Sequence, residues 1–166
     1  MITFNPTYYD VHWYGPYPHN SPELDFNLVL YMICATHAVY GSNCPLYIGM
    51  TEGGVSLRML EHKWLKDQID EPTIYTAAIS EMTNWKSVEG KTEYLPPPRK
   101  VISDIESLLI YAHQLTYNSK DKNIRLLHQR HFVVFNSGRR GRLFPEVSTM
   151  NWYGDITEAS QETPLK

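Results

Sequence analysis

The chain has 166 residues, 42% of them hydrophobic, which suits one compact domain with a buried core. Its longest apolar run, from Leu28 to Ala35, is far shorter than the roughly 18 residues that cross a bilayer, so we expect no membrane partner. Two cysteines, Cys34 and Cys44, are too few for a disulfide scaffold. A cytoplasmic protein with reduced thiols is therefore expected.

Charge is distributed unevenly around a net value of −3. Residues 1–57 carry four acidic side chains and no Lys or Arg, whereas residues 120–142 carry seven bases and one acid. The seven bases are Lys120, Lys122, Arg125, Arg130, Arg139, Arg140 and Arg142. A local basic patch counts for more than average charge when the partner is a polyanion. This segment predicts contacts to nucleic-acid phosphates, with a merely solvated basic face as the alternative.

The first half of the chain predicts an arm, a hairpin and a helix. Residues 1–27, rich in Tyr, Trp and Pro, show no clear period and indicate an irregular arm that packs aromatic rings on the core. Residues 28–34 and 46–50 are strand-like and predict a β-hairpin with a long loop. After Gly53-Gly54, apolar residues at helical spacing predict an amphipathic helix; these are Leu57, Leu60, Trp64 and Leu65.

The second half predicts one more strand, one helix and a terminal hairpin. Residues 73–79 suit a third strand, and the polar stretch 81–98 ends in three prolines, typical of a rigid linker. A helix is expected from about Lys100 to Leu115, with an apolar face of Ile102, Ile105, Leu109 and Ala112. Residues 132–135 and 142–144 predict a hairpin.

These elements predict a single α/β (α+β) domain with a small central antiparallel sheet of about three strands flanked by helices. We expect the core of the domain to span residues 28–118, preceded by the arm at 1–27. A basic extension with the C-terminal hairpin covers 119–153, and a polar tail covers 154–166.

Residue types that suit phosphodiester chemistry follow one another along these elements. In chain order they are Tyr31, Tyr47, Arg58, His62 and Glu106. The two tyrosines lie in the predicted hairpin, and Gly49 closes the motif Tyr-Ile-Gly at the end of its second strand. Arg58 and His62 are one turn apart on one helix face, and Glu106 lies on the later helix, which Asn118 follows.

With these residues the chain resembles the GIY-YIG nuclease superfamily over roughly residues 28–118. Val29-Leu30-Tyr31 stands where the family has its first tripeptide, and Tyr47-Ile48-Gly49 matches the second in full. Arg58 lies 58 − 47 = 11 residues after Tyr47, near the family's spacing, and Asn118 lies 118 − 106 = 12 residues after Glu106, as in the family. Two departures are the valine in place of the first glycine and a longer spacer between the tyrosines. The Arg-x-x-x-His pairing is similar to that of some restriction enzymes of the superfamily.

The resemblance implies an endonuclease that uses Mg²⁺ (or Mn²⁺) bound by Glu106. Phosphodiester hydrolysis adds negative charge to the phosphoryl oxygens, and the planar Arg58 guanidinium suits them. We expect Tyr31 to activate the attacking water with help from His62, while Tyr47 orients water or phosphate. Arg58, a protonated His62 or the metal would favour the tyrosine phenolate. How the two tyrosines divide the work stays open.

Gly49 and Asn118 are expected to support the site, Asn118 by tying the end of the second helix to a tyrosine-bearing strand. DNA is favoured over RNA as the partner, and the oligomeric state is open, with a dimer possible. Two alternatives remain: an RNA or single-strand nuclease of the same fold, because aromatic and arginine side chains suit single strands too, and a catalytically silent nucleic-acid-binding module.

Overall fold

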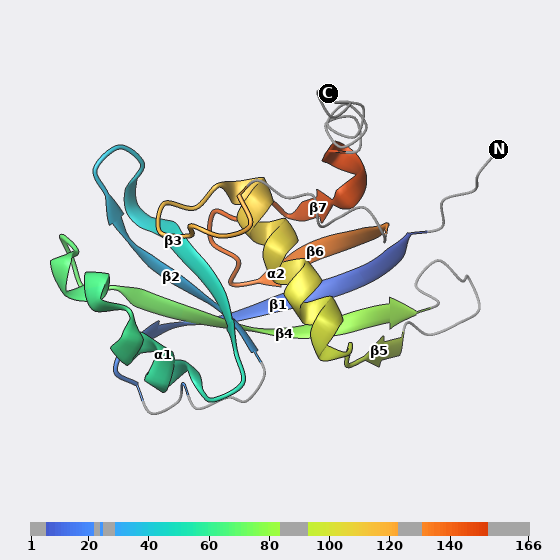
Figure 1. Cartoon of the computed structure of the whole chain (residues 1–166), viewed down its shortest axis with the longest axis horizontal. Helices are drawn as coiled ribbons and strands as arrows, with labels where there is room; N and C mark the ends of the chain where they lie inside the picture. The colour runs from blue at the N-terminus through green and yellow to red at the C-terminus, as the bar shows by residue number, and fades with distance from the viewer. Residues whose placement is uncertain (1–5, 22–23, 25–28, 84–92, 123–130, 153–166) are drawn as a thin grey trace, which may run out of the picture.

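The computed structural model describes residues 6–21, 24, 29–83, 93–122 and 131–152. Figure 1 shows the elements, whose labels are used from here on. The strands are β1 (Thr7–Pro18), β2 (Val29–His37), β3 (Gly41–Thr51), β4 (Thr73–Thr83), β5 (Glu93–Leu95), β6 (Phe132–Gly138) and β7 (Glu146–Ser148). The helices are α1 (Val55–Glu61) and α2 (Arg99–His113), with 3₁₀ turns η2 (Lys63–Asp67) and η4 (Thr149–Trp152).

One mixed sheet organises the described part of the chain. The sheet has seven strands. Six of them follow the order β3-β2-β4-β1-β6-β7, and the seventh, β5, pairs with β4 beside this path. The pairing of β1 with β6 is parallel, and every other pairing is antiparallel. The expected sheet of about three strands flanked by helices is therefore wrong, because the fold is dominated by a larger mixed sheet.

Strand β1 replaces the irregular arm expected at the N-terminus. It lies between β4 and β6, inside the sheet. Tyr9, Val11 and Trp13 alternate into the core, with exposed fractions of 5%, 0% and 0%. This alternation is the pattern of a half-buried strand. The surrounding tyrosines and prolines obscured it in the sequence.

Both hairpins differ from their predicted form. Strands β2 and β3 pair antiparallel as expected, but β2 continues to His37 and β3 begins at Gly41, so the connection is short rather than long. The Nδ1 atom of His37 accepts hydrogen bonds from the backbone N–H groups of Val39 and Tyr40, which closes this turn. In the C-terminal hairpin, β6 pairs with Glu146–Ser148 and not with residues 142–144.

Helix α2 covers one face of the sheet and follows its prediction closely. It begins after Pro98 and ends where Gln114 adopts a left-handed conformation. The buried side chains Ile102, Ile105 and Leu109 pack in the same core cluster as the sheet residues Val11, Trp13, Leu30, Met32 and Ile48. Ala112 packs against the cluster as a partly buried residue. In Figure 1 α2 crosses the sheet in front of β1 and β6.

Helix α1 is shorter than expected and covers the opposite face. It ends at Glu61, and its buried side chains are Val55 and Met59, which pack with Tyr31, Ile33 and Ile74. The predicted face is partly wrong: Leu57 and Leu60 are 60% and 81% exposed. Within the described residues, no helix has the length and apolar character needed to span a membrane.

His113, at the end of α2, fastens the β6–β7 connection to the helix. Its Nδ1 lies 2.8 Å from the Leu109 carbonyl oxygen, and its Nε2 accepts a hydrogen bond of 2.9 Å from the backbone N–H of Phe144. These two contacts require a neutral imidazole with the proton on Nδ1. Burial lowers the pKa of His113 below its ordinary 6.5.

Acidification is therefore expected to weaken this contact and the fold with it. Above pH 6.5 the imidazole is neutral in both folded and unfolded chains, so its contribution is fully present. As pH falls from 6.5 through the lower folded pKa, the unfolded chain takes up the proton first, and the free energy of unfolding decreases. Thermal unfolding at several pH values measures this loss, which should shrink in His113→Gln. An equal loss in both proteins would contradict the assignment.

Candidate active site

Two tyrosines and a histidine form an aromatic cluster on the α1 face of the sheet. Tyr31 on β2 and Tyr47 on β3 stack with ring centroids 5.8 Å apart. The Tyr31 hydroxyl lies 3.0 Å from Nε2 of His62, which follows α1 directly. The His62 ring meets Tyr47 edge-on at 4.6 Å. The structure thus brings together three of the residues that the sequence predicted for the site.

Gly49 leaves the space that the tyrosine rings occupy. It pairs with Tyr31 across the β2–β3 ladder. A Cβ atom at this position would lie 2.6 Å from Cε1 of Tyr47 and 2.7 Å from the Tyr31 hydroxyl oxygen. Real carbon atoms do not approach so closely, so any other residue would displace one of the two rings.

Gly49→Ala is accordingly expected to destabilise the protein by about 1–3 kcal/mol, the usual cost of overpacking. Gly53→Ala is a matched control, because a Cβ there meets nothing within 4 Å. Chemical denaturation of both variants measures the difference. Equal stability of the two variants would mean that the tyrosine rings can shift to accommodate a Cβ atom without loss of folding free energy.

The segment after α2 covers the outer edge of β3. The Asn118 side chain accepts a hydrogen bond of 3.0 Å from the backbone N–H of Ile48 and donates one of 2.8 Å to the Ile48 carbonyl oxygen. The backbone N–H of Tyr117 donates to the Leu46 carbonyl oxygen at 2.9 Å. Asn118 therefore ties the end of α2 to the strand that carries Tyr47, in the way the sequence suggested. At Leu46 and Ile48 the backbone groups on the outer edge of β3 are therefore already bound.

Glu106 reaches the same edge two residues further along β3. Its Oε1 accepts a hydrogen bond of 2.9 Å from the backbone N–H of Met50. Burial raises the pKa of Glu106 to about 7, although the Met50 hydrogen bond opposes the rise. Asp121 raises the pKa further, and Arg58 and Lys120 lower it. Glu106 therefore binds β3 at the residue that follows Gly49.

Four groups of the predicted site lie within mutual electrostatic range. The Glu106 charge raises the pKa of both Tyr31 and Tyr47, and the Arg58 charge lowers the pKa of both. The contacts agree with this: Glu106 binds the backbone of Met50, which follows Gly49 beside the two tyrosine rings, and Met50 lines the same hollow as Arg58.

The tyrosines are not phenolates in this environment. Burial is the largest cause that raises the pKa of both Tyr31 and Tyr47 above 10, and it outweighs the opposing Arg58 charge. Burial, followed by Arg58, also lowers the pKa of His62, so its imidazole is neutral at neutral pH. Arg58 thus favours the phenolates as expected, although burial outweighs it, whereas the expectation of a protonated His62 is wrong. With the proton on Nδ1, Nε2 of His62 is the atom that accepts the Tyr31 hydroxyl proton.

Arg58 lies on α1 beside a cavity of about 390 Å³. Its guanidinium pairs with Glu61, one turn later, and 46% of its side-chain surface is exposed. Arg99, at the start of α2, reaches the same cavity and pairs with Glu52. The other lining residues are the two carboxylate partners, Glu52 and Glu61, with Met50, Thr51, Gly53, Gly54 and Leu57. Two guanidinium groups thus border the hollow next to the Glu106–Met50 contact, and Arg99 carried no signal in the sequence because no local spacing links it to Arg58.

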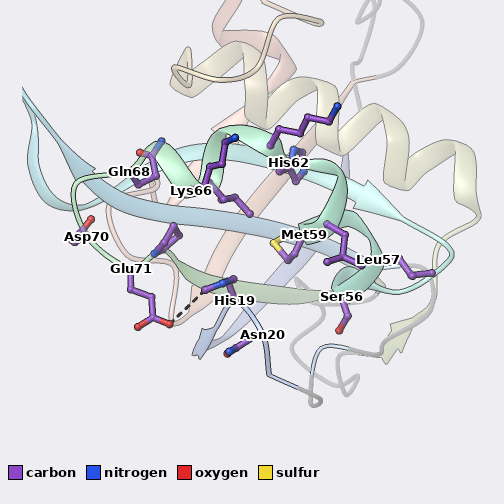
Figure 2. A pocket seen from close by; sticks show the side chains of 14 residues that line it. His19, Asn20, Ser56, Leu57, Met59, His62, Lys66, Gln68, Asp70 and Glu71 are labelled. Atoms are coloured by element: carbon purple, nitrogen blue, oxygen red, sulfur yellow. Dashed lines mark ion pairs between the residues drawn. The ribbon is translucent and has the colours of Figure 1, made fainter.

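A wider groove of about 860 Å³ lies on the other side of α1, shown in Figure 2. His62 is the one candidate residue of the described site that lines it. Leu57 borders both hollows. Toward the end of β1 the groove ends at His19, which pairs with Glu71 at 3.5 Å, the dashed contact in Figure 2. Helix α1 therefore separates the charged cavity from a mostly apolar groove.

The predicted basic residues differ in their contacts, and two of them lie outside the described residues. The Lys120 charge lowers the pKa of Glu106. Arg142 donates to the carbonyl oxygens of Tyr40 and Ser42 at the tip of the β2–β3 hairpin, and Arg140 donates to that of Leu143. Lys122 and Arg139 lie in described segments, whereas Arg125 and Arg130 lie outside the described residues. Phosphate binding by this set of basic residues stays a prediction. Of the three arginines between residues 139 and 142, Arg140 and Arg142 already bind backbone carbonyl oxygens.

Comparison with known proteins gave no relative. No family model matches the chain, and no curated protein or solved structure does. A function for this chain is consequently inferred from its sequence motif and from the geometry of the site.

Proposed function

We propose that this chain is a metal-dependent endonuclease that hydrolyses phosphodiester bonds in DNA. The observation that carries the proposal is that Glu106 binds Met50, next to the Gly49 that lies against the Tyr31–Tyr47 pair, and that Met50 and Arg58 line one cavity. This cavity of about 390 Å³ could hold a phosphate group. The similarity of the Tyr47-Ile48-Gly49 motif and its spacings to GIY-YIG nucleases supports the same activity.

Glu106 suits a Mg²⁺ or Mn²⁺ ion, since these ions prefer oxygen ligands. Among the described residues, Met50 donates to Oε1 and no group donates to Oε2. In the described part of the chain no three His, Cys, Asp or Glu side chains gather around one point, so water and substrate phosphate would complete the coordination. When bound, the ion neutralises charge on the phosphoryl group and lowers the pKa of a bound water.

The remaining side chains divide the chemistry among them. Arg58 exchanges Glu61 for the non-bridging phosphate oxygens, which its planar fork fits in a bidentate manner. The neutral His62 takes up the proton of the attacking water through the Tyr31 hydroxyl, to which it is hydrogen-bonded. Tyr47, stacked on Tyr31, orients the water or the phosphate. We further infer that the protein acts in the cytoplasm, which its low cysteine content supports.

The proposal is tested by incubating the purified chain with supercoiled plasmid, single-stranded DNA and RNA, in Mg²⁺ or in EDTA. We expect DNA cleavage in Mg²⁺ and none in EDTA. A protein that retards DNA on a gel and leaves it intact in Mg²⁺ would be a silent binding module. Cleavage confined to RNA would overturn the choice of DNA.

A further inference from the structure

A stacked pair of aromatic rings extends the tyrosine cluster toward solvent. Trp64 on η2 and Tyr117, which follows α2, have ring centroids 4.0 Å apart and planes only 5° from parallel. Trp64 in turn lies 5.6 Å from the His62 ring and 6.3 Å from the Tyr47 ring. The rings therefore form a continuous series from the candidate reaction centre to the surface.

Tyr117 is held rigidly in this position. Its backbone N–H is bound to Leu46 on β3, and its hydroxyl accepts a hydrogen bond of 3.1 Å from the Gln68 side chain. The same amide nitrogen donates to the Trp64 carbonyl oxygen at 3.0 Å, so Gln68 links both members of the pair. A ring that is fixed before binding loses little conformational freedom when a ligand stacks on it.

Tyr117 is the exposed member of this pair. Tyr117 is 40% exposed, and within the described part of the chain it stacks on no ring besides Trp64. Leu46, next to Tyr117, is four residues along β3 from Met50, where Glu106 binds; this corresponds to about 13 Å of strand. Lys120, three residues after Tyr117, carries a positive charge that lowers the pKa of Glu106. An open, flat ring beside a phosphate site and a lysine is the arrangement that binds unpaired nucleobases.

We propose that Trp64 and Tyr117 form a nucleobase subsite, in which an unpaired base close to the scissile phosphate stacks on the open face of Tyr117. This inference rests on the proposed nuclease function, which supplies the position of the phosphate. In a regular duplex both faces of every base are covered by neighbouring bases. The substrate is therefore DNA that is single-stranded, or unpaired near the cleavage point.

Binding measured without cleavage tests the subsite. In a Glu106→Gln background, fluorescence anisotropy follows a 5′-labelled 15-residue oligothymidylate and the same strand annealed to its complement. Tyr117→Leu removes the ring and should weaken binding of the single strand about 5- to 150-fold, the range for loss of one stacked base. Tyr117→Phe keeps the ring and should bind within about 2-fold of its parent. Duplex affinity should not change in either variant.

An abasic nucleotide moved along the oligothymidylate makes the test specific. At one position it should weaken binding to the parent protein and have no effect on Tyr117→Leu, because base and ring stabilise binding only together. Equal losses for duplex and single strand, or an abasic effect that persists in Tyr117→Leu, would overturn the subsite. Failure of the nuclease proposal looks different: the wild-type chain would leave every substrate intact while this base dependence is still measurable. Thermal unfolding of each variant ensures that the compared proteins are folded.

Discussion

Replacing Glu106 by glutamine is expected to lower Mg²⁺-dependent DNA cleavage by about 10³-fold or more. A metal ion supplies several kcal/mol of transition-state stabilisation, and each 1.4 kcal/mol corresponds to roughly tenfold in rate. Glutamine removes the charge that attracts the cation. Its carbonyl oxygen can still accept the hydrogen bond from Met50, so the edge of β3 stays covered. Cleavage of a 5′-labelled single-stranded DNA under single-turnover conditions measures the effect.

Asp104→Asn provides the matched control for this variant. Asp104 lies on α2 two residues before Glu106, and the substitution removes one carboxylate from the same helix. Its cleavage rate should remain close to that of the wild type. If Glu106→Gln cuts as fast as Asp104→Asn, Glu106 does not hold the metal.

Arg58→Ala is expected to slow cleavage by about 10²- to 10³-fold. Removing one donor that stabilises developing negative charge has an effect of this size in other enzymes. The loss should appear in the rate of the chemical step more than in DNA affinity, because the guanidinium meets charge that develops during the reaction. Arg58→Lys keeps the charge without the bidentate fork and should fall between wild type and alanine. Single-turnover rates at saturating protein, with affinities from anisotropy, separate the two effects.

The partner of Arg58 offers a second, opposite variant. Glu61→Gln removes the carboxylate that pairs with Arg58 and leaves the guanidinium free to bind phosphate. This variant should cleave DNA at least as fast as the wild type. A loss as large as that of Arg58→Ala would mean that the ion pair itself, rather than the free guanidinium, is what the site needs.

Local periodicity was enough to predict the elements whose apolar residues repeat regularly. Helix α2 follows its predicted segment because its buried residues repeat at helical spacing, and β2 was recognisable as a continuous apolar run that is buried along most of its length. Strand β1 was missed since its partner β6 lies more than a hundred residues away, and such a pairing leaves no local signal. The position of the β2–β3 turn depends on hydrogen bonds to the His37 side chain, which spacing does not reveal.

In the site, too, sequence spacing identified some residues, whereas others are recognisable only from tertiary contacts. Spacing identified Tyr31, Tyr47 and His62, which the structure brings into one cluster. Spacing could not identify Trp64 and Tyr117 as a pair, because the two residues lie on separate elements. They meet only because the segment after α2 binds the edge of β3. Nor did spacing indicate that burial would keep the tyrosines protonated, since burial depends on how α1 packs on the sheet.

The account depends on Glu106 and Arg58 serving the same phosphate, and a double variant measures this most directly. Single-turnover cleavage of a 5′-labelled DNA strand in Mg²⁺ is compared for wild type, Glu106→Gln, Arg58→Ala and the double variant. Groups that act as a unit in one transition state lose much less together than the product of their separate losses. We therefore predict a double variant barely slower than the slower single variant. A rate reduced by the full product of the two separate losses would contradict a shared site.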